Sequence, residues 1–111
     1  MQLPLQITFH HMPKSEALEE VIRERAGKLA QVYDRMIGCR VVVDAPHRNQ
    51  QKGRSYEVRI DISVPGSEIV ITREPRPECL AAVNDAFEVA RRRLMDFAKK
   101  RKAKEHTPPL A

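Results

Sequence analysis

The sequence predicts an α+β fold: a two-layer sandwich in the order β-α-β-β-β-α, with a four-stranded mixed sheet and both helices on one face. Three observations lead to this prediction. Four short segments alternate apolar and polar residues, as half-buried strands do. Two longer segments repeat apolar residues at helical spacing. Each helix has a single apolar stripe, so both helices should cover the same side of the sheet.

The first strand is expected at residues 3–9, where apolar residues occupy every second position. A helix should follow, because Ser15 is a good N-cap and an apolar stripe runs from Leu18 to Met36. Gly38 is expected to end this helix as a C-terminal glycine.

Three more strands are expected at residues 39–44, 56–64 and 68–72, with a turn at Pro65-Gly66-Ser67 between the last two. The first helix should connect two parallel strands, and the remaining strands can form an antiparallel meander. A long second helix follows Pro77. Its apolar face comprises Leu80, Val83, Phe87, Ala90, Leu94, Phe97 and Ala98. We expect one domain over residues 1–104 and a flexible tail over 105–111.

Composition narrows the class of protein. The chain has 111 residues, of which 41% are hydrophobic and 32% charged, as in a soluble globular domain. No apolar run approaches the roughly 20 residues of a membrane span, and the N-terminus does not resemble a signal peptide. Two cysteines are too few for a disulfide framework. We therefore expect a cytoplasmic protein.

Positive charge is concentrated near the C-terminus. Residues 91–104 contain eight of the twenty Lys and Arg residues and one acid, Asp96, which gives a net +7 where the whole chain carries +5. Such a concentration favours a surface that binds a polyanion. The alternative is a solvated helix end, since cations suit the helix dipole, but about two or three of them suffice for that purpose.

No set of residues predicts catalysis, a metal or a cofactor. His10 and His11 are adjacent on a strand and should point to opposite faces, so they are expected to be solvent-facing and not to share a metal ion. Cys39 is in the core phase of its strand. Cys79 begins the second helix, where the dipole could lower a thiol pKa, but no catalytic partner accompanies it. We therefore expect that the protein is not an enzyme.

The aromatic residues restrict how a nucleic acid could bind. All five lie in the apolar phase of their elements. The solvent face of the sheet should instead carry mixed charge, from residues such as Arg40, Arg59 and Asp61. Sheets that bind single-stranded RNA by stacking need aromatic rings on that face. A nucleic acid is therefore expected to meet the helices and loops, through phosphates and shape.

Several segments resemble the bacterial ribosome hibernation factors, the family of ribosome-associated inhibitor A (protein Y) and the hibernation promoting factor. The matching segments are residues 25–29, 58–66, 82–85 and 92–94, and the resemblance runs from about Leu5 to Lys102. It implies a fold similar to double-stranded RNA-binding domains. It also implies binding to the small ribosomal subunit between head and body, where the protein blocks the messenger and the A- and P-site tRNA positions in stationary phase or stress.

The resemblance also suggests which residues contact ribosomal RNA. Arg25, Lys28, Arg92 and the run 99–102 match basic positions of relatives, whereas Val89 and Asp96 stand where relatives often carry Lys. Together with the helical wheel, these matches give the candidate rRNA-binding residues Arg23, Arg25, Lys28, Arg91, Arg92, Arg93, Lys99, Lys100, Arg101 and Lys102.

The expected partner is the small ribosomal subunit with its ribosomal RNA, without a membrane or a small-molecule substrate. We expect no second domain of the kind with which longer relatives pair ribosomes into dimers. The alternative is a protein-interaction module that regulates a transcription factor, a role once attached to the family name.

Overall fold

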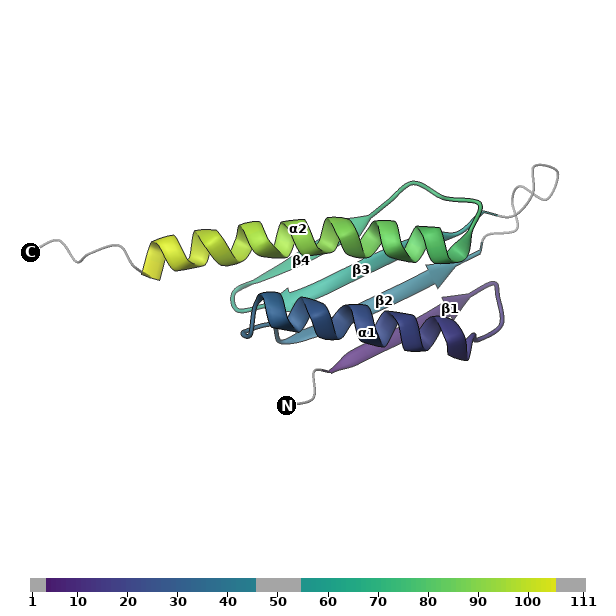
Figure 1. The fold of residues 1–111 in the computed structure, drawn as a ribbon, viewed down its shortest axis with the longest axis horizontal. Helices are drawn as coiled ribbons and strands as arrows, with labels where there is room; N and C mark the ends of the chain where they lie inside the picture. The colour runs from purple at the N-terminus through teal and green to yellow at the C-terminus, as the bar shows by residue number, and fades with distance from the viewer. Residues whose placement is uncertain (1–3, 46–54, 106–111) are drawn as a thin grey trace, which may run out of the picture.

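The computed structural model describes residues 4–45 and 55–105, with side chains through Arg101. Its elements follow the predicted order β-α-β-β-β-α (Figure 1). They are β1 (Leu5–His10), α1 (Glu16–Val32), β2 (Gly38–Asp44), β3 (Glu57–Val64), β4 (Ser67–Thr72) and α2 (Cys79–Glu105). The tail expected at 105–111 lies outside the described residues except for Glu105, which ends α2.

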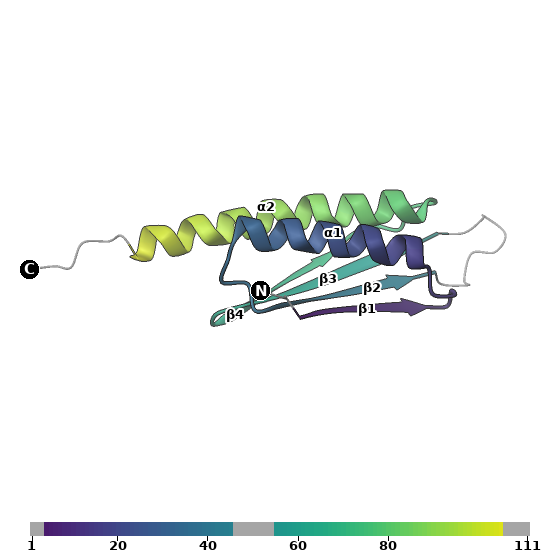
Figure 2. The same ribbon diagram turned by 60° about the horizontal axis from the view of Figure 1, so that its bottom comes forward.

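The sheet has the strand order β1-β2-β3-β4. β1 and β2 are parallel, because α1 carries the chain back between them, and the β2–β3 and β3–β4 pairs are antiparallel. Both helices cover the same face of the sheet and run in the same direction (Figures 1 and 2). The predicted two-layer α+β architecture is thus confirmed.

The core lies between the helices and this sheet face. Every second residue of β2 and of β3 is buried in it, Ile71 is buried from β4, and Ile22, Ala26 and Leu29 fill it from α1. From α2 come Val83, Ala86, Phe87, Ala90 and Leu94, among others. Among the aromatic residues Phe87 is buried, and the other four are partly buried and pack against this core. No polar or charged residue of the described chain is buried, so the core is held by apolar contact.

Two expectations about the helices were wrong. α1 ends at Val32, where the backbone N–H of Tyr33 bonds to the Leu29 carbonyl, and Gly38 is the first residue of β2. Met36 misled the prediction because it is buried from the connecting segment, not from a further helical turn. Leu80 is 48% exposed. It precedes Ala90 by ten residues, which places it about 80° around the helix from the buried face.

The turn between β3 and β4 lies beneath the later part of α2. Gly66 has a φ of +75° in this turn, a conformation that glycine adopts without steric cost. α2 passes this turn and continues beyond the end of the sheet (Figures 1 and 2). The last residues of the helix therefore have no sheet beneath them.

Candidate nucleic-acid interface

The two halves of α2 differ in charge. Residues 79–90 contain two acids, Asp85 and Glu88, and neither Lys nor Arg, whereas residues 91–105 contain eight cations and two acids. The first half packs on the sheet, and the second half begins over the sheet and extends past it (Figure 1). The basic run found in the sequence therefore belongs to the end of α2 that is least covered by the fold.

The cations of α2 point in several directions. Arg92 and Lys99 are seven residues apart, so they share the outer face of the helix, and both are exposed. Arg91 faces α1. Arg93 is turned to the opposite side, where its Nη1 donates to the carbonyl oxygen of Val70 in β4 at 3.2 Å. Lys100 lies on the same side of the helix as Arg93 and is exposed.

The cations of α1 do not form one surface either. Arg25 and Lys28 face α2, and Lys28 is exposed. Arg23 precedes Arg25 by two residues, or about 200° of helix, and therefore lies on the other flank. Its Nη2 is 3.8 Å from Oε1 of Glu19. The structure thus separates Arg23 from the other predicted contact residues.

A groove of about 340 Å³ lies between α1 and α2. Arg25 and Lys28 from α1 and Arg91 from α2 line it, together with Asn84 and Glu88. Leu29 and Phe87 supply its apolar surface. Three cations in one groove make it suitable for a phosphate group, which prefers several charge-assisted hydrogen bonds. Asn84 adds an amide whose Oδ1 is buried without a hydrogen-bond partner.

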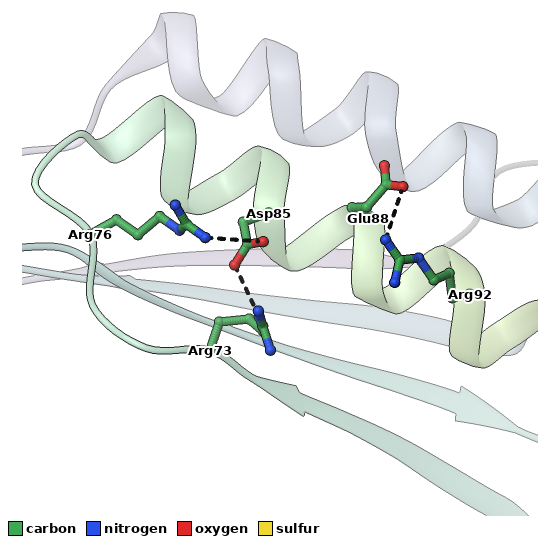
Figure 3. A network of polar contacts seen from close by, with 5 residues as sticks. All are labelled: Arg73, Arg76, Asp85, Glu88 and Arg92. Atoms are coloured by element: carbon green, nitrogen blue, oxygen red, sulfur yellow. Dashed lines mark hydrogen bonds and ion pairs between the residues drawn. The ribbon is translucent and has the colours of Figure 1, made fainter.

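Few of the predicted contact residues are engaged by strong ion pairs. Lys28 Nζ is 3.5 Å from Oε1 of Glu24, and Arg92 Nη2 is 3.6 Å from Oε1 of Glu88 (Figure 3). Such exposed pairs contribute little free energy and can give way to another anion. Within the described side chains, four predicted residues have neither an ion pair nor a hydrogen bond: Arg25, Arg91, Lys99 and Lys100.

Arg101 differs from these four because its guanidinium is turned inward. Its Nη2 donates to the carbonyl oxygen of Pro65, and the group lies 5.4 Å from the centroid of the Phe97 ring. The side chain is half-buried. Lys102 is part of α2, but its side chain lies outside the described residues.

Sequence reasoning missed a polar network that secures the start of α2. Asp85 accepts a hydrogen bond from Nε of Arg73 at 2.9 Å and lies 3.5 Å from Nη2 of Arg76 (Figure 3). The hydrogen bond from Arg73 is the main reason why the pKa of Asp85 lies below its ordinary value. Tyr56 and Arg76 also exchange backbone hydrogen bonds. Together these contacts hold the β4–α2 connection against the first half of the helix.

Asn84 was also not predicted as a site residue. The spacing of Asn84, Phe87, Glu88 and Arg91 places them on one helical face, and that periodicity was readable in the sequence. The sequence could not show that this face lies opposite Arg25 and Lys28, because the pairing depends on how the helices dock.

The open face of the sheet carries mixed charge, as predicted. Arg40 and Arg59 are exposed there, and Nε of Arg59 donates to Oδ1 of Asp61 at 3.0 Å. All five aromatic residues pack with the core. Within the described residues, the open face of the sheet therefore offers no Phe or Tyr ring for base stacking.

The described residues include two histidines, His10 and His11, and two cysteines, Cys39 and Cys79. His10 and His11 are exposed, and Nδ1 of His11 lies 2.8 Å from Oδ1 of Asp44. Within the described chain, no group of three or more His, Cys, Asp or Glu residues is arranged to hold a metal ion. Burial raises the pKa of the Cys39 thiol to about 12, with a smaller effect from Asp61. Burial also raises the pKa of Cys79, contrary to the lowering considered from the helix dipole.

No helix in the described residues is long and apolar enough to cross a membrane. A comparison with curated protein sequences found no match.

Solved structures with the same fold are more informative. The structure of a ribosomal subunit interface protein from Coxiella burnetii matches with a TM-score of 0.74 and 14% sequence identity, over 87% of this chain and 99% of that one. The crystal structure of the Thermus thermophilus Protein Y N-terminal domain matches with a TM-score of 0.70 and 13% identity, over 86% and 99% of the two chains. At such identities the matches establish the fold.

The family is established by the sequence itself. Residues 5–102 match the profile of the family described as sigma 54 modulation protein / S30EA ribosomal protein. This range covers all six helices and strands of the structure except the last three residues of α2. The match confirms the resemblance to the hibernation factors, and the chain belongs to the sigma 54 modulation protein / S30EA ribosomal protein family.

Proposed function

We propose that this protein is a non-enzymatic translation inhibitor that binds ribosomal RNA of the small subunit. One observation carries the proposal: within the described residues, exposed or half-buried cations without an intramolecular partner lie in the α1/α2 groove and on the second half of α2. They are Arg25, Arg91, Lys99 and Lys100. The fold needs none of these charges for its own contacts. Family membership supports a ribosomal partner, as does the likeness in fold to the Coxiella burnetii protein, a ribosomal subunit interface protein.

The arrangement suits recognition of a folded RNA by charge and shape. Two parallel helices hold Lys28 and Arg91 on either side of a groove, and the outer face of α2 adds Arg92 and Lys99. Phosphates that enter would replace the weak pairs of Lys28 with Glu24 and of Arg92 with Glu88. Contacts of this kind fix orientation without reading base sequence.

The physiological consequence follows from the family resemblance. Bound in the channel between head and body, the protein would occupy the messenger and the A- and P-site tRNA positions. Translation would stop while the protein remains bound, as suits stationary phase or stress in the cytoplasm. Sucrose-gradient profiles of growing and starved cells would test this: we expect the protein to move with small subunits or whole ribosomes after starvation.

The binding mode has a direct test in salt dependence. Release of counterions from phosphates makes the logarithm of the binding constant fall linearly with the logarithm of salt concentration. We expect purified small subunits to lose the protein steeply between roughly 50 and 200 mM salt, the range over which several phosphate contacts have a large effect. Salt-independent binding would contradict an interface made of phosphate contacts.

A matched pair of variants assigns the surface. Lys99→Glu and Arg40→Glu each change the net charge by two units, and each replaces an exposed cation that lacks an intramolecular partner. Lys99 lies on α2, whereas Arg40 lies on the open sheet face. We expect Lys99→Glu to weaken binding about tenfold and Arg40→Glu to change it by less than about twofold, since only one replaces an RNA contact. Equal losses would mean that overall charge, not this surface, controls binding.

A second candidate function is a protein-interaction module that regulates a transcription factor. It is favoured by the words "sigma 54 modulation protein" in the description of the family. The two functions differ in whether RNA holds the complex together. Ribonuclease treatment should dissolve complexes of an rRNA-binding protein, and complexes that survive it would favour the protein partner.

A further inference from the structure

The side chain of Arg101 connects α2 to the sheet layer. Its Nη2 donates to the carbonyl oxygen of Pro65, in the turn between β3 and β4. Its guanidinium also lies over the ring of Phe97, 5.4 Å from the centroid. Beyond this point the backbone of α2 continues for four residues, to Glu105.

Two aromatic rings support the position of the Arg101 guanidinium. The ring of Phe97 packs edge-on against the ring of Tyr33, with centroids 5.7 Å apart, and Tyr33 caps the C-terminus of α1. The turn leaves room for the guanidinium because residue 66 is glycine: a Cβ there would lie 3.2 Å from Nη2 of Arg101. The end of α2 is thus joined both to the end of α1 and to the β3–β4 turn.

We propose that Arg101 is a positioning residue. It does not itself bind phosphate but keeps the basic end of α2 helical in the free protein, in the orientation that binds RNA. The proposal rests on the proposed rRNA binding and refines it, because it removes one residue from the predicted contact set. The residues that Arg101 would orient are Lys99 and Lys100, which lie two residues and one residue before it and have no intramolecular partner in the described structure.

The physical reason is the cost of ordering. A helix end without tertiary contacts frays, because each residue held in helical geometry loses backbone entropy. With Arg101 in place, the end of the helix is already ordered in the free protein, so its backbone entropy is lost before binding. Without it, the lysines would still reach their phosphates, but the ordering would occur on binding and would weaken affinity. A positioning role therefore predicts weaker binding with an unchanged number of phosphate contacts.

The first measurement needs no RNA. Arg101→Met keeps an apolar stem but removes the guanidinium, and Phe97→Leu removes the ring beneath it without changing charge. In the free protein we expect both variants to speed hydrogen exchange at amides 99–104 about threefold to tenfold, while the core strands keep their protection. Lys99→Gln is the control and should leave this exchange unchanged. Unchanged exchange in both variants would overturn the proposal.

The second measurement is the salt dependence of binding to small subunits. We expect Arg101→Met and Phe97→Leu each to weaken binding about threefold to tenfold at one salt concentration, with the wild-type log–log slope. Lys99→Gln should lower the slope by about 0.7–0.9, the loss of one phosphate contact. A lower slope in Arg101→Met alone would show that Arg101 contacts RNA and would overturn the proposal.

These outcomes separate the two proposals. If wild-type protein does not bind small subunits at all, the rRNA-binding function is wrong, and with it the role of Arg101 in binding. If wild type binds with a steep salt dependence but hydrogen exchange at amides 99–104 is the same in wild type, Arg101→Met and Phe97→Leu, only the positioning role is wrong.

Discussion

The first and second halves of α2 are continuous in the chain but differ in burial and in charge. Residues 79–90 bury Ala82, Val83, Ala86, Phe87 and Ala90 and carry no cation. Residues 91–105 bury only Leu94 in the described core and carry eight cations. The first half is joined to the β4–α2 connection through Asp85, whereas the second half extends beyond the sheet (Figure 1).

Stability and recognition therefore depend on different parts of one helix. The apolar first half fixes the position of the helix on the sheet, so the second half can present charge without having to form a core. Mutations in the first half should therefore act on folding. Mutations of the exposed cations in the second half should act on binding at nearly constant stability.

The largest effect is expected from Phe87→Ala in the first half. Phe87 is 4% exposed, so truncation removes buried apolar area and leaves a cavity. Such substitutions cost about 3–5 kcal/mol of unfolding free energy. Urea denaturation followed by circular dichroism would measure it. As the counterpart in the second half, Lys99→Ala should change stability by less than about 0.5 kcal/mol, and a comparable loss there would erase the distinction between the halves.

The next effect concerns binding. Reversing Arg92, Lys99 and Lys100 to Glu together should weaken association with small subunits at least about a hundredfold, because phosphate contacts are replaced by repulsion. Co-sedimentation at fixed salt would show it, and the urea midpoint should stay close to that of wild type. If binding persists, the second half of α2 is not the contact surface.

A smaller effect is expected at Asp85. Its folded-state pKa is lowered, chiefly by the hydrogen bond from Arg73, so the carboxylate stabilises the fold at pH values above its ordinary pKa of 3.8. That contribution is lost as pH falls through the lowered value. Asp85→Asn should therefore cost about 1 kcal/mol at pH 7, in line with exposed charge pairs, and less at pH 3.

Urea curves at the two pH values provide the measurement for Asp85. The difference between wild type and Asp85→Asn must shrink on acidification. A difference that grows at low pH would have the wrong sign for a carboxylate with a lowered pKa.

The smallest effect is expected at Asp96, the one acid within residues 91–104. It is exposed and has no ion pair or hydrogen bond in the described structure. Asp96→Lys should tighten binding to small subunits about twofold to fivefold at low salt, through added attraction to phosphate. The gain should vanish near 1 M salt. No gain at low salt would mean that the side of α2 bearing Asp96 is turned away from the RNA.

Much of the fold was predictable because strand and helix patterns here are clean. Alternation in residues 56–64 defined β3, and Ser15 marked the start of α1 with a hydroxyl that accepts from the Leu18 N–H. The end of α1 was not predictable, since Met36 continues the apolar spacing although the helix has already stopped. Burial of a loop residue and burial of a helix residue give the same signal in sequence.

The composition of the candidate site was also predictable, but not its arrangement. Charge counting identified the basic end of α2, and the helical wheel separated outer from inward residues. It could not show that Arg23 and Arg25 face different neighbours, or that Arg93 is turned toward Val70 of β4. Those facts depend on the docking of helices on the sheet, which no local pattern encodes. Lys102 remains a prediction.

The contact of Arg93 with β4 has a consequence for self-association. β4 is an edge strand, and edge strands offer unpaired carbonyl and N–H groups to any other extended chain. Arg93 occupies the Val70 carbonyl and adds an exposed positive charge beside that edge. If two copies approached each other through their β4 edges, the positive charge of Arg93 in one copy would come close to that of Arg93 in the other. The same arginine run that suits an RNA partner therefore also disfavours strand-to-strand pairing between copies of the protein.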